Sequence, residues 1–126
     1  MTIDRGIAAI TLFVEDLPKA KEFYARAFAA KTVYEDPDSA VFKFGSTLVN
    51  LLKVQAAPEL VAPAPVAPPE GGVRFQFTLN VDDVDAACAL LASRGVALLN
   101  GPMDRPWGIR TASFRDPAGH VWEIAK

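Results

Sequence analysis

The sequence predicts an α+β fold made of two tandem β-α-β-β-β units. The stretch ITLFVEDLPKAKEFY, from Ile10, returns in similar form as FTLNVDDVDAACALL, from Phe77. The stretch STLVNLLK in the first half likewise matches the last eight residues, GHVWEIAK. A repeat of this length indicates two copies of one supersecondary unit. We therefore expect a single domain, residues 1–126, with units at 5–54 and 73–126 joined by a proline-rich linker at 55–72.

Each unit is expected to open with a strand that leads into a helix. Residues 7–14 and 73–81 alternate in polarity and are rich in β-forming residues, which indicates strands. An acidic pair follows each strand, where a carboxylate can cap helix N–H groups and favour the positive end of the helix dipole. Helices are therefore expected at about 18–28 and 84–93. Their inward residues should be Ala20, Phe23, Tyr24 and Ala27 in the first helix, and Ala87, Leu90 and Leu91 in the second.

Three shorter strands should follow each helix. They are expected at 32–35, 40–44 and 47–53 in the first unit, and at 97–99, 109–115 and 120–125 in the second. The turn-forming stretches EDPDS and DPAG separate the strands. Periodicity is lost in the linker, QAAPELVAPAPVAPPEGG, which is expected to be a loop or an extended segment.

Composition excludes several classes of function. Hydrophobic residues make up 51% of the chain and the net charge is only −2, so there is no basic footprint for nucleic acid. No apolar run is long enough to span a membrane, and the N-terminal stretch does not resemble a cleaved signal. The single cysteine, Cys88, allows no intrachain disulfide. A cytoplasmic protein that binds neither nucleic acid nor membrane is expected.

The alternation of side chains across strands assigns a set of polar residues to one face of the predicted sheet. Phe75, Phe77 and Leu79 should lie under the helix, which leaves Gln76 and Thr78 on the opposite, open face. The repeat then places further residues on the open faces of the two units. These are Asn50, Thr111, Ser113 and Glu123.

One carboxylate on this face raises the question of a metal site. His120, the only histidine, is an odd number of residues from Glu123, so in a regular strand the two side chains point to opposite faces. A zinc or iron site normally requires three or four nitrogen, sulfur or carboxylate ligands. Glu123 alone is therefore not predicted to form a metal site.

The paired β-α-β-β-β units, the V-x-D stretches that lead into each helix and the ending FRDPAGHVWEI together resemble the vicinal oxygen chelate superfamily. This superfamily includes glyoxalases, extradiol dioxygenases and bleomycin-resistance proteins. The resemblance implies a curved eight-stranded mixed sheet around a cleft. It also implies a homodimer, because a second subunit often completes the cleft in this family.

The resemblance also bears on metal binding. The positions that match the ligands of metal-dependent members are Ala9, Asn50, Gln76 and Glu123. Only Glu123 has a strong ligand side chain, and Ala9 has none. The chain in this respect resembles the antibiotic-binding branch of the family, and RPWG, residues 105–108, is similar to a stretch found there.

The function expected from these observations is metal-free binding, possibly sequestration, of a small organic molecule or antibiotic in the cleft, without a cofactor. Phe13 and Trp107 would stack on the ligand, whereas Glu123 would meet a hydrogen-bond donor or a cation. The full set of expected ligand-binding residues is Phe13, Asn50, Gln76, Thr78, Trp107, Thr111, Ser113 and Glu123.

Several alternatives stay open from the sequence. Trp107 could pack at a subunit interface, and Glu123 could be satisfied by Gln76, Arg74 or Arg110. The protein could be a lyase or isomerase in which Glu123 is the general base, or binds Mg²⁺ or Mn²⁺ together with amide oxygens. It could also be a non-catalytic paralogue kept for assembly, whose cleft is filled by its own side chains or by the linker.

Overall fold

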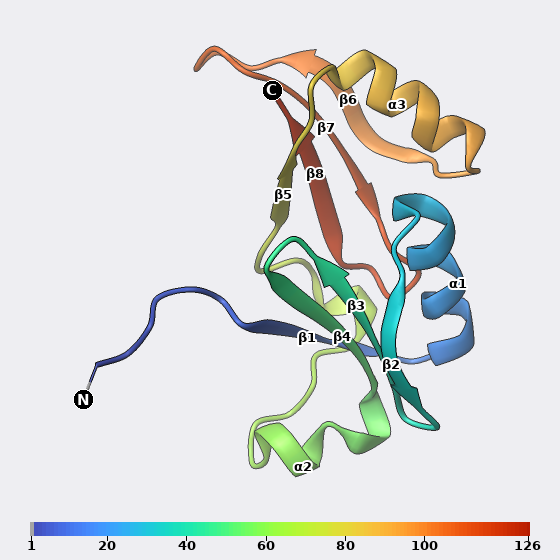
Figure 1. Ribbon diagram of the computed structural model, residues 1–126, viewed down its shortest axis with the longest axis vertical. Helices are drawn as coiled ribbons and strands as arrows, with labels where there is room; N and C mark the ends of the chain where they lie inside the picture. The colour runs from blue at the N-terminus through green and yellow to red at the C-terminus, as the bar shows by residue number, and fades with distance from the viewer. Residues whose placement is uncertain (1) are drawn as a thin grey trace. The chain divides into compact units, whose positions relative to one another are not determined.

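The computed structural model describes residues 2–126 and divides the chain into two compact units, with the boundary in the sequence between Val66 and Ala67. Each unit contains a four-stranded mixed sheet and a helix (Figure 1). The predicted α+β class and the duplicated β-α-β-β-β order are confirmed. The eight strands are divided between two sheets, neither of which is closed.

The first unit follows the predicted order of elements. It contains β1 (Ala9–Val14), α1 (Leu17–Phe28), β2 (Thr32–Asp36), β3 (Ser39–Phe44) and β4 (Thr47–Lys53). The strand order is β1-β4-β3-β2, with β1 parallel to β4 and the other pairs antiparallel. The expected linker contains a 3₁₀ turn, Val54–Ala56, and the short helix α2, Pro58–Val61. It is therefore not simply an extended segment.

The second unit repeats this topology. After a 3₁₀ turn at Pro69–Gly71 come β5 (Phe77–Asn80), α3 (Val84–Ser93), β6 (Leu98–Asp104), β7 (Arg110–Arg115) and β8 (Val121–Ala125). The strand order is β5-β8-β7-β6, and β5 is parallel to β8. In both units the first strand thus lies at an edge of the sheet and pairs in parallel with the last strand of the same unit. No helix within residues 2–126 is long and apolar enough to cross a membrane.

The acidic pairs cap the helices as the sequence predicts. In each pair the second residue is the N-cap: the carboxylate of Asp16 accepts a hydrogen bond from the backbone N–H of Lys19, and that of Asp83 from Ala86. Both hydrogen bonds are 3.0 Å long. Each cap satisfies a helix N–H that has no partner within the helix.

The predicted inward face of α1 is confirmed, but that of α3 is partly wrong. Ala20, Phe23, Tyr24 and Ala27 are all buried. In α3 the buried residues are Val84, Cys88 and Leu91, whereas Leu90 is 49% exposed. The buried set has the i, i+4, i+7 spacing of a single helical stripe, and Leu90 falls about 120° away from that stripe at ~100° per residue.

Two strands of the second unit differ from the prediction. β5 is shorter than the expected 73–81 and covers only Phe77–Asn80, and Phe75 is largely exposed. β6 is longer than the expected 97–99 and runs to Asp104, with irregular register between Asn100 and Met103. The sequence NGP within β6 favours a turn, but the strand absorbs it as an irregularity opposite β7.

Candidate functional site

A row of polar side chains crosses the sheet of the second unit. Thr78 on β5 is the register partner of Glu123 on β8, Glu123 is the partner of Ser113 on β7, and Ser113 is the partner of Asn100 on β6. Register partners project to the same side of a sheet. The alternate residues Trp122, Ile124, Ala112 and Phe114 form buried core on the other side. We refer to Thr78, Glu123, Ser113 and Asn100 as the polar row.

Hydrogen bonds orient the middle of the polar row. The hydroxyl of Thr78 donates to Oε1 of Glu123 at 2.8 Å, and the amide Nε2 of Gln76 donates to Oγ of Ser113 at 3.2 Å. Glu123 is only partly exposed, and its second oxygen, Oε2, makes no hydrogen bond or ion pair within residues 2–126. Because Ser113 accepts from Gln76, its own hydroxyl proton can be donated to a neighbour.

The end of the polar row lacks a donor. The side-chain oxygen Oδ1 of Asn100 is buried and has no hydrogen-bond partner within the described part of the chain. A buried acceptor without a donor carries a desolvation penalty of about 1–3 kcal/mol. A water or a ligand that donates a hydrogen bond would remove this penalty.

The first unit has a related but simpler pair. Thr11 on β1 and Asn50 on β4 are register partners, as Thr78 and Glu123 are in the second unit. Asn50 therefore occupies the place that Glu123 occupies in the other copy, and its Oδ1 is also buried without a partner within residues 2–126. Phe13 lies partly exposed on the same strand as Thr11. The two units thus present a carboxylate in one copy and a neutral amide in the other.

A second group of side chains lies at the loop between β6 and β7. Nε of Arg105 donates to the hydroxyl of Thr111 at 2.9 Å, and the Arg105 guanidinium lies over the ring of Trp107, 5.9 Å from its centroid. Thr111 is fully buried, whereas Trp107 is 68% exposed. Arg105 therefore connects a buried hydroxyl to an exposed aromatic surface.

These contacts decide which of the expected residues lie together. Gln76 with Ser113 and Thr78 with Glu123 form two hydrogen-bonded pairs, which are neighbours because Ser113 and Glu123 are register partners. Thr111 and Trp107 are joined through Arg105. Phe13 and Asn50 belong to the first unit. Asn100 and Arg105 were not predicted. Asn100 was missed because its strand was expected to end at Leu99. Arg105 was missed because its hydrogen bond to Thr111 depends on the course of the loop between β6 and β7, which the sequence does not show.

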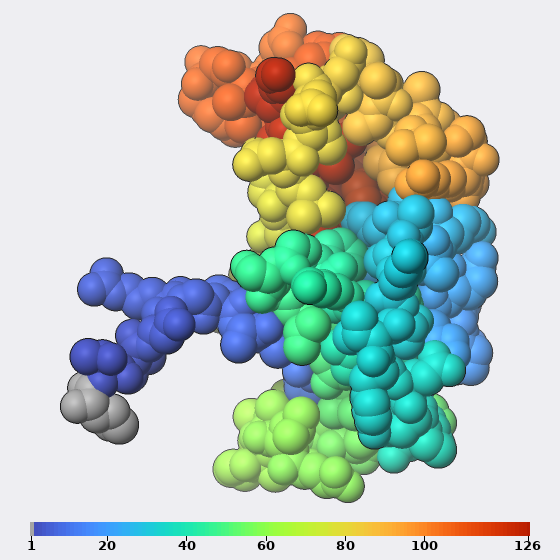
Figure 2. Space-filling model, viewed as in Figure 1, coloured from blue at the N-terminus to red at the C-terminus, as the bar shows by residue number. Residues whose placement is uncertain are grey.

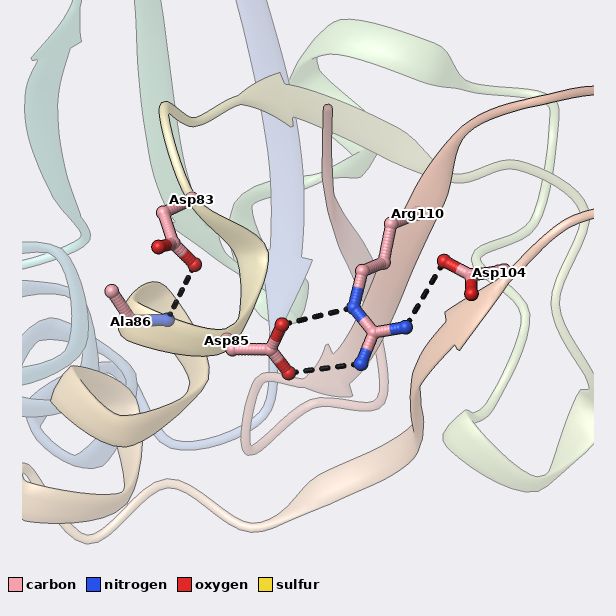
Figure 3. A network of polar contacts seen from close by, with 5 residues as sticks. All are labelled: Asp83, Asp85, Ala86, Asp104 and Arg110. Atoms are coloured by element: carbon pink, nitrogen blue, oxygen red, sulfur yellow. Dashed lines mark hydrogen bonds and ion pairs between the residues drawn. The ribbon is translucent and has the colours of Figure 1, made fainter.

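The partner of Glu123 is also different from those expected. Glu123 accepts a hydrogen bond at Oε1 from Thr78, and not from Gln76, which bonds to Ser113, or from Arg74 or Arg110. Figure 3 shows that the Arg110 guanidinium instead holds both oxygens of Asp85, at 2.9 and 3.0 Å, and one oxygen of Asp104 at 3.0 Å. The hydrogen bonds to Asp85, followed by the one to Asp104, raise the pKa of Arg110. The hydrogen bonds from Arg110 in turn lower the pKa of Asp85. This cluster fastens the start of α3 to β6 and β7.

His120 belongs to the turn that precedes β8, and it is only partly exposed. Its Nδ1 lies 2.8 Å from Oδ2 of the buried Asp116, and its ring lies beside Phe75. The other oxygen of Asp116 accepts from the backbone N–H groups of Ala118 and His120. The Asp116 carboxylate thus organises the turn that sets the position of β8, and with it that of Glu123.

The donor residues do not fit a metal centre of the kind that the family resemblance implies. No three His, Cys, Asp or Glu side chains gather within residues 2–126. Of the four matching positions, Ala9 has no ligand atom, and Glu123 already accepts a hydrogen bond from Thr78. Burial also raises the pKa of Cys88, which favours the protonated thiol over the thiolate that metals require.

Comparison with known proteins agrees with the fold. Residues 6–124 match the model of the Glyoxalase/Bleomycin resistance protein/Dioxygenase superfamily. The chain is 34% identical over 122 residues to the uncharacterized protein YraH of Bacillus subtilis, covering 93% of this chain and 94% of YraH.

Two solved structures illustrate the likeness. A glyoxalase/bleomycin resistance protein/dioxygenase from Nocardioides has a TM-score of 0.85 and 26% identity, with 98% of this chain and 85% of that chain covered. A lactoylglutathione lyase from Agrobacterium tumefaciens has a TM-score of 0.76 and 26% identity, with coverage of 98% and 94%. The predicted family resemblance is therefore confirmed.

Proposed function

The chain belongs to the Glyoxalase/Bleomycin resistance protein/Dioxygenase superfamily, and on that premise we propose that its polar row binds a small organic molecule without a metal ion. The proposed binding includes sequestration of an antibiotic. The observation that carries it is the unused acceptor Oε2 of the partly exposed Glu123, on the same face as the buried Oδ1 of Asn100, which also lacks a donor within the described residues.

These acceptors define the chemistry of the ligand. A carboxylate and an amide oxygen both accept hydrogen bonds, so the matching ligand carries donors, such as an amine, an amide or hydroxyl groups. A cationic amine would gain most, because hydrogen bonds between charged groups are stronger than neutral ones. The exposed ring of Trp107 adds a flat surface on which an aromatic part of the ligand can stack.

The choice between binding and metal-dependent catalysis depends on the side chains that could ligate a metal ion. One structural relative is a lactoylglutathione lyase, which raises the possibility of an enzyme. Three of the four positions that match family metal ligands carry an alanine or a neutral amide, and no triad of metal-ligating side chains gathers within the described residues. The arrangement supports recognition by hydrogen bonds and stacking, for which no bond needs to be made or broken.

The experiment is an isothermal calorimetric titration with tryptamine, an aromatic amine, and with indole-3-acetate, an aromatic anion of similar size; both carry the fluorophore of tryptophan, so heat and not emission is measured. Trp107 is exposed while Trp122, the other tryptophan, is buried, so Trp107 is the tryptophan on which the ligand can stack. We expect saturable binding of tryptamine and at least tenfold weaker binding of indole-3-acetate. Bleomycin, which is rich in donors, is tested by competition with tryptamine.

The variant Glu123→Gln keeps the shape of the side chain but removes its charge. It should weaken tryptamine binding by about tenfold, equivalent to ~1.4 kcal/mol. The matched control is Glu59→Gln, an exposed residue in the short helix α2 that should leave the affinity unchanged. Equal binding of the amine and the anion, or an unaltered affinity in Glu123→Gln, would contradict the proposal. A stoichiometric metal ion that is lost in Glu123→Ala would instead favour the metal-dependent lyase or isomerase.

A further inference from the structure

A concave surface lies on the first unit, between α1 and the β2–β3 hairpin. This pocket has a volume of about 380 Å³. Figure 2 shows the surfaces of α1 and β2 lying next to each other. We refer to it as the α1 pocket, and its lining residues are Leu17, Pro18, Lys21, Glu22, Ala25, Thr32, Asp36, Pro37 and Lys53.

The α1 pocket is separate from the face that carries Asn50. Lys53 is the last residue of β4 and has the same parity as Val49 and Leu51, which are buried on the side covered by α1. Asn50 has the opposite parity and projects to the other side of the sheet. The α1 pocket is thus on the helix side of its unit, and the residues proposed above for ligand binding take no part in it.

Most charges in the α1 pocket are already committed to partners. The Lys21 ammonium pairs with Glu35 at 3.0 Å, and Glu22 pairs with Arg26 at 3.6 Å. One oxygen of Asp36 accepts from the backbone N–H groups of Asp38 and Ser39 and from the Ser39 hydroxyl, and the other accepts from the Tyr34 hydroxyl.

The exception is Lys53. Within residues 2–126 its ammonium makes no ion pair and no side-chain hydrogen bond, although the residue is only partly exposed. Asp36 keeps its negative charge, because all of its hydrogen-bond donors are neutral, but both of its oxygens are occupied. The pocket cation that has no partner within the described residues is therefore Lys53, at the end of β4. An anion that approaches this ammonium directly forms a charge-assisted hydrogen bond with it.

The rest of the lining suits an apolar body. Leu17, Pro18, Ala25 and Pro37 contribute hydrocarbon surface between the charged side chains. The hydroxyl of Thr32 makes no hydrogen bond within the described residues and is free to donate. A volume of about 380 Å³ lies at the lower end of the range found for small-molecule pockets.

From this arrangement we propose that the α1 pocket is a binding site for a small organic anion with an apolar body. Its carboxylate lies against the Lys53 ammonium and its hydrocarbon part against Leu17, Pro18 and Pro37. The site is distinct from the polar row and takes a ligand of the opposite charge. The protein in this proposal carries two binding sites of complementary chemistry, one for donors and one for an anion.

The test is a backbone amide NMR titration of the whole protein with sodium benzoate, with benzamide and benzylammonium as neutral and cationic probes of the same shape. Benzoate should cause saturable shifts centred on Leu17, Lys21, Ala25 and Thr32, and bind at least fivefold more tightly than either analogue. Equal affinity for benzoate and benzamide, or benzoate shifts spread over the whole surface, would overturn the proposal.

Two lysine variants sharpen the result. Lys53→Gln should weaken benzoate binding at least fivefold, whereas Lys19→Gln, which lies on α1 but outside the pocket, should leave it unchanged. The two variants remove the same charge from the protein, so an equal effect would indicate general electrostatics and overturn the assignment to Lys53. Glu123→Gln should not alter benzoate binding; if it does, the anion binds elsewhere and the proposal fails independently of the donor site.

Discussion

At the scale of single residues, the polar row illustrates how far side-chain parity can go. Parity placed Thr78, Ser113 and Glu123 on one face, and their register in the structure agrees. Parity could not choose hydrogen-bond partners: Gln76, Arg74 and Arg110 were the candidates for Glu123, and the observed partner is Thr78. That choice depends on distances of a few tenths of an ångström, which arise only when the strands are assembled.

Gly101 provides a residue-scale prediction in the irregular part of β6. Its φ is +85°, and an added Cβ would lie 2.6 Å from the carbonyl oxygen of Thr111 and 2.7 Å from Cα of Ala112. Both atoms are backbone and cannot move aside cheaply. We expect Gly101→Ala to lower the free energy of unfolding by at least ~2 kcal/mol, through strain at positive φ and overpacking.

Gly45→Ala is the matched control for this prediction. Gly45 also has a positive φ, of +60°, but no atom lies within 4 Å of its added Cβ. It should therefore cost only about 1 kcal/mol, the conformational part of the penalty. Urea unfolding of both variants measures the difference, and equal losses of stability would show that the close approach of β6 to β7 is not what requires glycine.

At the scale of elements, the helices could be predicted from short stretches of sequence because their caps and amphipathic patterns are formed by residues close together in the chain. The acidic caps of α1 and α3 and the amphipathic stripe of α1 were sufficient to place both helices within a residue of their observed starts. β6 could not be predicted in full, because its pairing with β7 overrides the turn preference of Asn100, Gly101 and Pro102. The prediction that Leu90 is buried was wrong for a different reason. Because α3 has apolar residues on several sides, the sequence does not show which of them form the buried stripe.

The junction of α3 with β6 and β7 gives an element-scale prediction on pH. Arg110 lowers the pKa of Asp85 through two hydrogen bonds, so this carboxylate binds fewer protons in the folded than in the unfolded chain. Its stabilising contribution is fully present above the unfolded pKa of about 3.9 and is lost as the pH falls through the lower folded pKa. Asp85→Asn should therefore reduce the acid-induced fall in melting temperature below about pH 4.

Melting temperatures between pH 7 and pH 2.5 test this, with Asp82→Asn as the control. Asp82 precedes the same helix but makes no ion pair or side-chain hydrogen bond within residues 2–126. The prediction fails if Asp85→Asn and the unsubstituted protein lose the same amount of stability on acidification. It also fails if Asp82→Asn has the same effect as Asp85→Asn.

At the scale of the whole molecule, the duplication explains why the two copies can differ in function. Each unit keeps a threonine beside a polar residue on its last strand: Thr11 with Asn50, and Thr78 with Glu123. The topology requires only that these positions face away from the core, so their chemistry is free to vary between copies. The fold was accordingly predictable from the repeat, whereas the ligand depends on side chains that the repeat does not constrain.

The assembly state is the remaining whole-molecule prediction, and Trp107 connects it to function. The family resemblance leads us to expect a homodimer, which should sediment at twice the mass of one chain at micromolar concentration.

Trp107 is 68% exposed and lies beside the Arg105 guanidinium, so its ring can contact either a ligand or a second subunit. If it stacks on the ligand, Trp107→Ala should lose tryptamine binding, measured calorimetrically, and still sediment as a dimer. If the variant becomes monomeric, Trp107 is an interface residue, and its role in ligand stacking is wrong. The matched variant Leu99→Ala removes another exposed apolar side chain of the second unit and should alter neither property.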